Sequence, residues 1–439
     1  MNDRAHNLTR NPLAYLSGFG NEHKSEAIAG AVPERGTSPQ RHPLGLYHEQ
    51  ISGTPFTAGR SENRRTWMYR IRPSTMHGAM TQLPASLFRS APFNDMPATP
   101  NRMRWAPLPI PDEPCDFLQG LRTVGGNGDV AQHAGMAMHW YAANRTMKSV
   151  FYNADGELAI FPQSGTLHIF TELGRMELPV GEIGVIPRGI KFRVEVDGPI
   201  RGFVCENYGR HFRLPDLGVV GANGLAYPRD FMTPTAAFED TDEPVDLIVK
   251  YEGNLWATRL AYSPLDVVGW FGNHAPYKYP VKCFNTLNTV SFDHPDPSIF
   301  TFLTSPSMLP GTANVDICLL APRWQVAEES FRGAYFHSNV CSEFIGLLSG
   351  SHESKGASFS PGSSSLHNGL VAHGPDVETF EAGYQEALVP RKLEGSLSFL
   401  VESGLAIRPT PFAVEAPQRQ DDYDACWSGF RKMFGKGAG

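Results

Sequence analysis

Short apolar runs separated by glycine, proline and aspartate dominate two long stretches of the chain. In the first stretch the runs lie at residues 151–152, 158–161, 166–171, 175–178, 183–186, 191–196 and 201–205. In the second stretch they lie at residues 289–292, 300–303, 314–320, 343–348 and 396–402. Short strands at such close intervals are typical of antiparallel sandwiches and barrels. The pattern therefore predicts a mainly β protein with long loops and few helices.

One stretch resembles a known hairpin. Residues 178–189 (LPVGEIGVIPRG) resemble the hairpin of a cupin jelly roll, in which a Pro-x-Gly turn leads into a strand closed by Pro-Arg-Gly. Because short strands occur on both sides of a loop-rich middle region, we expect two cupin-type jelly-roll or β-sandwich domains, a bicupin-like arrangement. In the first of them His133, His139 and His168 lack the HxH…E layout of a cupin metal site. We therefore expect the first barrel to be structural.

The chain divides into three regions on this pattern. Residues 1–110 are polar, rich in proline and short of periodic pattern, and they predict an extended, loop-rich N-terminal arm that could cross to a neighbouring subunit. Residues 111–280 predict an N-terminal β-sandwich domain with a linker region, and residues 281–439 predict a C-terminal cupin-type domain that ends in a helix. The helix is expected at residues 421–434, where acidic residues come first and basic residues last. A second helix is expected at residues 245–259.

Composition and charge narrow the class of protein. Hydrophobic residues make up 41% and charged residues 19% of the chain, and its 43 glycines and 36 prolines favour strands and turns. A net charge of −7 offers no basic surface, so nucleic acid and membrane partners are not expected. No apolar run approaches the about 20 residues that span a bilayer, and residues 1–7 lack the layout of a signal peptide. We expect a cytoplasmic protein whose six scattered cysteines are reduced.

The candidate chemistry lies between residues 335 and 376. His337, Glu343 and His373 supply two imidazoles and one carboxylate, the set that a non-haem Fe(II) site uses when one face of the metal stays open. His337 and Glu343 are an even number of residues apart, so in extended chain they would project to the same side. Glu343 leads an apolar strand, where an unpaired carboxylate would be costly. The spacing alone also allows a purely structural interpretation. In it His337 caps a strand, Glu343 is a solvated residue at a sheet edge and His373 occupies a turn.

A second group of polar residues surrounds these three. His294 follows the apolar run at 289–292, and a histidine side chain, which titrates near neutral pH, could take a proton from a metal-bound phenol. A turn histidine bonded to a neighbouring aspartate is an equal alternative. His352, His367 and Asn339, together with His373, are candidates for hydrogen bonds to a substrate.

Long motifs along the whole chain resemble those of the homogentisate 1,2-dioxygenase family. They are residues 17–23 (SGFGNEH), 38–41 (SPQR), 63–73 (NRRTWMYRIRP), 201–209 (RGFVCENYG), 221–226 (GANGLA), 228–231 (PRDF), 293–301 (DHPDPSIFT), 322–324 (PRW), 342–347 (SEFIGL), 373–376 (HGPD) and 423–427 (YDACW). The resemblance implies a cupin-type fold, Fe(2+) bound by His337, Glu343 and His373, and His294 as proton acceptor. It also implies a homohexamer built as a dimer of trimers. The implied reaction is the opening of homogentisate by O2 to 4-maleylacetoacetate in tyrosine and phenylalanine catabolism.

Departures from the family pattern lie close to these residues. The family usually has tyrosine, associated with substrate binding, at the position of His352. It commonly has arginine at the position of Ser338 and methionine at those of Cys341 and Ile345. Because all three expected ligands and the base are present, we expect oxygenase chemistry. The substrate could instead be a different hydroquinone-type acid, gentisate-like or a substituted homogentisate.

Two further alternatives belong to other functional classes. A non-catalytic bicupin would bind or store a ligand, and its histidines would hold no iron. A Zn or Mn cupin isomerase would use the same three ligands without oxygen chemistry.

Overall fold

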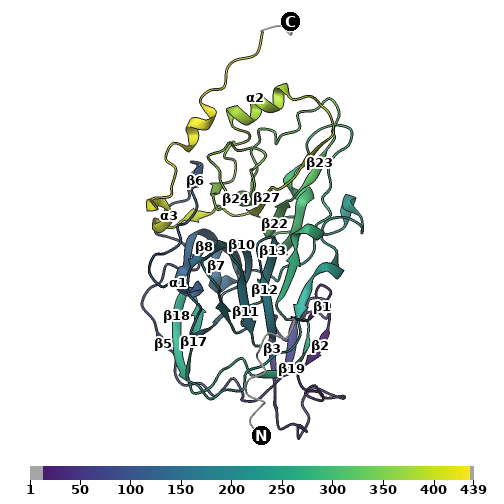
Figure 1. Cartoon of the computed structure of the whole chain (residues 1–439), viewed down its shortest axis with the longest axis vertical. Helices are drawn as coiled ribbons and strands as arrows, with labels where there is room; N and C mark the ends of the chain where they lie inside the picture. Colours follow the sequence, from purple (N-terminus) through teal and green to yellow (C-terminus); the bar gives the residue numbers. More distant parts are fainter. Residues whose placement is uncertain (1–12, 436–439) are drawn as a thin grey trace.

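A nine-stranded antiparallel sheet runs through the middle of the computed structural model, which describes residues 13–435 (Figure 1). Its strands in spatial order are β1 (Tyr15–Ser17), β16 (Met232–Pro234), β20 (Tyr277–Pro280), β13 (Glu182–Ile186), β10 (Glu157–Ser164), β15 (Ile200–Asn207), β8 (Ala134–Ala143), β7 (Leu121–Asp129) and β28 (Arg408–Pro409). Strands of the other sheets pack on both sides of it. The prediction of a mainly β, bicupin-like fold with few helices is confirmed.

The remaining strands form three larger sheets and one pair. A seven-stranded sheet contains β12 (Gly174–Leu178), β11 (Leu167–Thr171), β14 (Phe192–Glu195), β9 (Val150–Asn153), β17 (Val245–Tyr251), β18 (Asn254–Leu260) and β5 (Thr81–Gln82). A four-stranded sheet contains β2 (His23–Glu26), β19 (Val267–Gly272), β4 (Arg65–Arg70) and β3 (Tyr47–Ser52). A six-stranded sheet contains β21 (Thr301–Pro306), β22 (Ala313–Leu320), β27 (Leu397–Ser403), β24 (Ser342–Ser349), β25 (Ser364–His367) and β6 (Met103–Trp105). The pair is β23 (Arg323–Gln325) with β26 (Arg391–Leu393).

Helices are few and short in the described part of the chain. The three α-helices are α1 (Phe117–Gly120), α2 (Val377–Gln385) and α3 (Pro411–Glu415). The 3-10 helices are η1 (Val130–Gln132), η2 (Gly218–Val220), η3 (Pro228–Asp230), η4 (Val281–Cys283), η5 (Pro297–Phe300) and η6 (Tyr423–Trp427). Between residues 13 and 435 no helix has the length and apolar character needed to cross a membrane. Residues 1–7, on which the signal-peptide interpretation rested, lie outside the described part.

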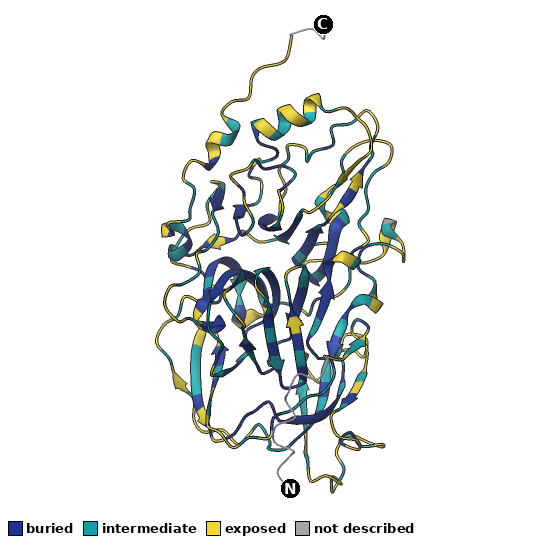
Figure 2. Ribbon diagram, viewed as in Figure 1, coloured by how far each residue is buried: buried dark blue, intermediate teal, exposed yellow. Residues whose placement is uncertain are grey.

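The central sheet is buried on both faces because its strands are apolar on both faces. In β10 the alternate residues Leu158 and Ile160 belong to the core shared with the seven-stranded sheet. Ala159 and Phe161 belong to the core shared with the six-stranded sheet. The Phe161 ring stacks on Phe399 of β27, with ring centroids 4.3 Å apart and planes inclined by 14°. Figure 2 shows these central strands buried, whereas α2 at one end of the molecule has no buried residue.

The helix expected at residues 245–259 is wrong, because this segment forms the hairpin β17–β18. The two strands pair in antiparallel register from Val245 with Leu260 to Tyr251 with Asn254. Between them Glu252 and Gly253 both have positive φ, 45° and 74°. Two consecutive residues of this kind make the tight turn that matches the twist of a hairpin. The apolar residues that suggested helical spacing are therefore distributed over two strands.

The helix expected at residues 421–434 is also wrong. Only the single 3-10 turn η6 forms there, and Phe434 beyond it is 89% exposed. Gly429 interrupts the segment, and glycine costs about 1 kcal/mol relative to alanine inside a helix. Trp427 instead donates its indole N–H to the carbonyl oxygen of Pro375 at 3.0 Å. Tertiary contacts of single side chains therefore determine the course of the tail.

The N-terminal segment is tied to the sheets of its own chain. Strand β4 pairs with β19, and β6 pairs with β25 of the six-stranded sheet. Trp105 of β6 is fully buried and donates its indole N–H to the carbonyl oxygen of Ala413 at 2.8 Å. The region boundaries at residues 110 and 280 stay predictions. The contact of the arm with a neighbouring subunit also stays a prediction.

We expect Phe399→Ala to destabilise the fold strongly, since it empties the contact between the central and six-stranded sheets. Truncating a buried phenylalanine typically costs about 3–5 kcal/mol of unfolding free energy. The urea midpoint should fall accordingly, whereas that of the matched control Phe434→Ala, at an exposed position, should not change. A Phe399→Ala midpoint equal to that of the control would contradict the proposed packing.

Candidate metal centre

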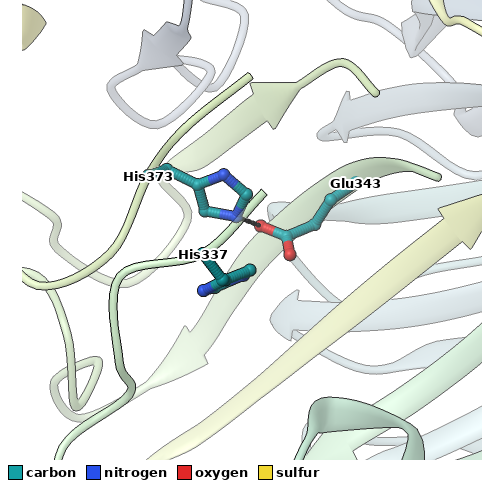
Figure 3. A group of neighbouring side chains, drawn as sticks. All are labelled: His337, Glu343 and His373. Atoms are coloured by element: carbon teal, nitrogen blue, oxygen red, sulfur yellow. Dashed lines mark ion pairs between the residues drawn. The ribbon is translucent and has the colours of Figure 1, made fainter. Parts of the chain in front are cut away.

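His337 and His373 are brought together by the backbone. The two residues form an isolated antiparallel bridge in which His337 N donates to His373 O at 2.9 Å and His373 N donates to His337 O at 3.0 Å. The chain between His337 and the start of β24 is irregular, so the expectation that His337 and Glu343 share one extended segment is wrong. Glu343 approaches from the beginning of β24. One ligating atom from each of the three residues lies within 4.8 Å of the others (Figure 3).

Hydrogen bonds determine which ring nitrogen of each histidine is free. His337 Nδ1 lies 2.8 Å from the carbonyl oxygen of Tyr335, and His373 Nδ1 lies 2.8 Å from that of Val371. A carbonyl oxygen only accepts, so both Nδ1 atoms carry the hydrogen and both Nε2 atoms keep a lone pair. His373 Nε2 is buried without a hydrogen-bond partner. A metal-binding histidine usually has this arrangement, with its other nitrogen donating to a protein oxygen.

Glu343 is an ionised carboxylate in a buried position. Its Oε1 lies 3.0 Å from His367 Nδ1 and 3.5 Å from His373 Nε2. Burial alone would raise the pKa of Glu343, but the hydrogen bond from His367 and the proximity of the His373 imidazole outweigh burial and hold it well below its usual value. Burial also lowers the pKa of His337, reinforced by His373. Although burial would lower the pKa of His373, the nearby Glu343 carboxylate raises it. With both Nε2 atoms unprotonated, the three residues offer two neutral nitrogens and one negative oxygen, which fits a divalent metal ion.

A cavity adjoins the three residues. It encloses about 570 Å³, including its open mouth, and its wall contains His337, Glu343 and His373 together with His294, His352 and Lys355. Ile345 and Leu400 line its floor from neighbouring strands of the six-stranded sheet. A few converging polar groups beside apolar side chains are typical of a small-molecule site.

His294 presents a free lone pair to this cavity. Its Nδ1 lies 2.9 Å from the carbonyl oxygen of Pro295, so Nδ1 carries the hydrogen. Its Nε2 is buried without a hydrogen bond and lies 3.9 Å from Glu353 Oε1. The other oxygen of Glu353 forms an ion pair with Arg323. Although burial would raise the pKa of Glu353, His294 and Arg323 hold it at about 2. A protonated His294 would therefore face a carboxylate.

The strand expected at residues 289–292, just before His294, is wrong. The segment is a loop in which Val290 and Phe292 are 69% and 57% exposed. Its apolar side chains cover no core, so the run lacks the burial that would stabilise a strand.

His352 presents an N–H donor at the cavity wall, whereas His294 presents a lone pair. The backbone N–H of Ser354 donates to His352 Nδ1 at 3.1 Å, so the ring hydrogen is on Nε2, which is buried and unpartnered at the cavity wall. Burial, reinforced by Lys355, lowers the pKa of His352 to about 4. Burial likewise lowers the pKa of Lys355 to about 8. At neutral pH the wall thus offers one neutral N–H donor and one ammonium group.

Two residues expected to contact a substrate do not reach the cavity. His367 is 1% exposed, and its two nitrogens bind Glu343 and Tyr423. Asn339 is exposed and accepts a hydrogen bond from the backbone N–H of Cys341 at 3.3 Å. His367 pairs with Glu343 across β25 and β24, so the register of the sheet places it behind the carboxylate. The structure does bring together His294, His337, Glu343, His352 and His373.

The sequence interpretation missed Glu353 and Lys355. Both lie in the loop after β24, two residues apart, and both line the cavity. Charged residues within a serine- and glycine-rich loop are usually solvated, and no periodic pattern marks these two as buried. Their position directly after His352 was the available signal.

Two family models match consecutive parts of the chain. The model described as homogentisate 1,2-dioxygenase N-terminal matches residues 14–281, and the one described as homogentisate 1,2-dioxygenase C-terminal matches residues 282–434. The chain belongs to the homogentisate 1,2-dioxygenase family. It is accordingly an enzyme, an oxidoreductase of the dioxygenase class, and membership of the homogentisate 1,2-dioxygenase family supports a ring-cleaving role.

The chain is also similar to solved structures outside the homogentisate 1,2-dioxygenase family. Protein Ylba from E. coli is 10% identical over 71% of this chain and 95% of that chain, with a TM-score of 0.32. A cupin 2 conserved barrel domain protein from Leptotrichia buccalis is 8% identical over 67% and 91%, with a TM-score of 0.28. A variant of Bacillus subtilis oxalate decarboxylase is 10% identical over 76% and 80%, with a TM-score of 0.29. These values are too low to support an inference about activity.

We predict that His352 makes the stability of the metal-free protein depend on pH. Its pKa of about 4 in the folded state lies below the value of about 6.5 in the unfolded chain. Stability from the neutral ring is therefore present above about pH 6.5 and lost as the pH falls towards 4. Between pH 7 and pH 5 this loss amounts to about 1–2 kcal/mol. His352→Gln should show a smaller decrease in urea midpoint between these pH values than the unchanged protein. An equal decrease in both would contradict a neutral, buried His352.

Proposed function

We propose that this protein is an Fe(II)-dependent dioxygenase that opens the ring of homogentisate with O2 to give 4-maleylacetoacetate. The observation that carries the proposal is the convergence of two histidine lone pairs and an ionised carboxylate on a cavity that also holds a free base. His337, Glu343 and His373 would hold the metal. When bound there, Fe(II) supplies Lewis acidity and an open face for a phenolate and O2.

His294 is the proposed general base. With its hydrogen on Nδ1, its Nε2 can accept a phenolic proton from a substrate in the cavity. The resulting imidazolium would be stabilised by Glu353, 3.9 Å away. Arg323 holds Glu353 in place by its ion pair. This arrangement gives the proton a defined destination and restores charge balance around it.

Lys355 and His352 are the proposed substrate contacts. Lys355 lines the cavity, and its positive charge would complement the negative charge of an aromatic acid. His352 would donate its Nε2–H to an oxygen of the substrate. The apolar floor formed by Ile345 and Leu400 suits an aromatic ring.

A second candidate is a dioxygenase acting on a different hydroquinone-type acid, gentisate-like or a substituted homogentisate. It is favoured by His352 itself, because a neutral imidazole differs in reach and shape from the tyrosine that the family usually has. Both candidates share the metal, the base and O2.

We further propose a homohexamer, a dimer of trimers, located in the cytoplasm. Family membership supports this assembly. Exposed apolar side chains near the metal ligands, Val340 at 75% and Leu370 at 69%, also favour a subunit contact.

Oxygen uptake after anaerobic loading with Fe(II) tests the function. We expect uptake on homogentisate with Fe(II) and none after loading with Zn(II) or Mn(II), measured with an oxygen electrode and by the absorbance of the product. Uptake only on another dihydroxyaromatic acid would select the second candidate. No uptake on any of them would reject both, and tight Zn(II) or Mn(II) binding would then favour an isomerase.

His294→Ala should retain Fe(II) and lose most turnover. Removing a general base typically lowers the rate by about 10²–10⁴-fold. Metal content measured on the same sample separates the two roles that His294 could have. Loss of iron together with activity would make His294 structural and contradict its role as base.

A further inference from the structure

Three buried side chains stand in a row behind the Glu343 carboxylate. Lys355 Nζ lies 2.8 Å from the hydroxyl oxygen of Tyr423, which lies 3.0 Å from His367 Nε2. His367 Nδ1 lies 3.0 Å from Glu343 Oε1. The exposed fractions of the four residues are 8% or less. They come from three separate parts of the chain: the loop after β24, η6 of the tail, and the paired strands β24 and β25.

The direction of every hydrogen bond in this row follows from the groups at its two ends. An ammonium group only donates, so the hydroxyl oxygen of Tyr423 must accept from Lys355. At the other end of the row the ionised Glu343 carboxylate only accepts, so His367 Nδ1 donates to it. In the neutral ring Nε2 is then unprotonated and accepts the single hydrogen of the Tyr423 hydroxyl. The ring hydrogen of His367 is therefore on Nδ1 and is donated to Glu343. In the opposite tautomer a nitrogen lone pair would face the carboxylate, which repels it.

The ring of His367 is packed against two aromatic neighbours. The ring centroids of His373 and Tyr423 lie 4.1 Å and 6.0 Å from that of His367, with planes inclined by 20° and 27°. Tyr423 is itself held by Arg104 of β6, whose guanidinium carbon lies 4.3 Å from the centre of the tyrosine ring. Because β6 pairs with β25, the tail is anchored to the strand that carries His367.

We propose that Tyr423, supported by Lys355, is a positioning residue that locks His367 in the Nδ1–H tautomer and thereby orients Glu343 as a metal ligand. The inference rests on the proposed metal-binding role of Glu343. It assigns a function to the C-terminal tail, since the hydroxyl group that completes the row belongs to η6.

The test is the Fe(II) affinity of Tyr423→Phe, which removes only the hydroxyl group. Affinity is measured anaerobically by competition with a chelator, without reference to turnover. Loss of an outer partner of a metal ligand typically lowers affinity by about 10–100-fold, and we expect about tenfold here. The matched control is Tyr384→Phe on α2, whose side chain is 63% exposed and whose affinity should equal that of the unchanged protein.

The same substitution made in a His367→Asn variant shows whether Tyr423 acts through His367. In His367→Asn the amide nitrogen can replace Nδ1 as donor to Glu343, and an amide has no alternative tautomer. Adding Tyr423→Phe to His367→Asn should therefore change the affinity no further. Two results would overturn the inference. One is a Tyr423→Phe affinity for Fe(II) equal to that of Tyr384→Phe. The other is an equal loss of affinity on adding Tyr423→Phe to the unchanged protein and to His367→Asn.

The tautomer can also be observed in the unchanged, metal-free protein by solid-state nitrogen NMR with labelled histidine. The chain has 15 histidines, so the His367 signals are assigned by their absence from His367→Asn. We expect Nδ1–H, and Nε2–H would overturn the inference even if Tyr423→Phe fails to fold. Failure of the unchanged protein to bind Fe(II) would instead refute the proposed function. Because the tautomer is measured without metal, its outcome is independent of that result.

Discussion

A single buried carboxylate, Glu343, sets the conditions that the rest of the site meets. An ionised carboxylate away from water is very costly unless charges or hydrogen-bond donors surround it. Glu343 is 5% exposed, and the imidazoles of His367 and His373 approach its Oε1. Both histidines are in turn oriented by other groups, His373 by a backbone carbonyl and His367 by Tyr423. A divalent metal would add the positive charge that this arrangement favours.

The position of Glu343 is set by the sheet that carries it. Strand β24 is paired on both sides, with Glu343 opposite Glu402 of β27 and His367 of β25. Burial, reinforced by Glu343, raises the pKa of Glu402 to about 7, which favours its neutral form compared with an ordinary carboxyl group and limits the repulsion. On the other face of the sheet Phe399 packs against Phe161 of the central sheet. The first sandwich therefore contributes to the site by supporting the strand that carries the carboxylate.

Proton positions divide the histidines of the site into two kinds. Backbone carbonyls take the Nδ1–H of His294, His337 and His373 and leave a lone pair on each Nε2. A backbone N–H takes the Nδ1 lone pair of His352 and leaves an N–H donor instead. One local hydrogen bond thus determines whether each ring presents a lone pair, as a ligand or base would, or an N–H donor.

Sequence patterns were sufficient for the fold class, because alternation and turn residues act locally. Eleven of the twelve apolar runs coincide with strands of the structure, whereas long strands such as β7 and β8 were not recognised. Spacing alone left the metal-binding role of His337, Glu343 and His373 open, and the family resemblance implied it. Local patterns misassigned residues 245–259 and 421–434, where a tight turn and single tertiary contacts outweigh apolar spacing.

Only the tertiary structure decided which polar residues face the cavity. It placed His367 behind Glu343 by strand register, and it buried Glu353 and Lys355 through contacts with residues distant in sequence. Residue type alone determined what chemistry the chain can perform, because a metal site accepts few kinds of ligand. The role of each individual group depends on burial and hydrogen-bond direction, which exist only once distant segments are in contact.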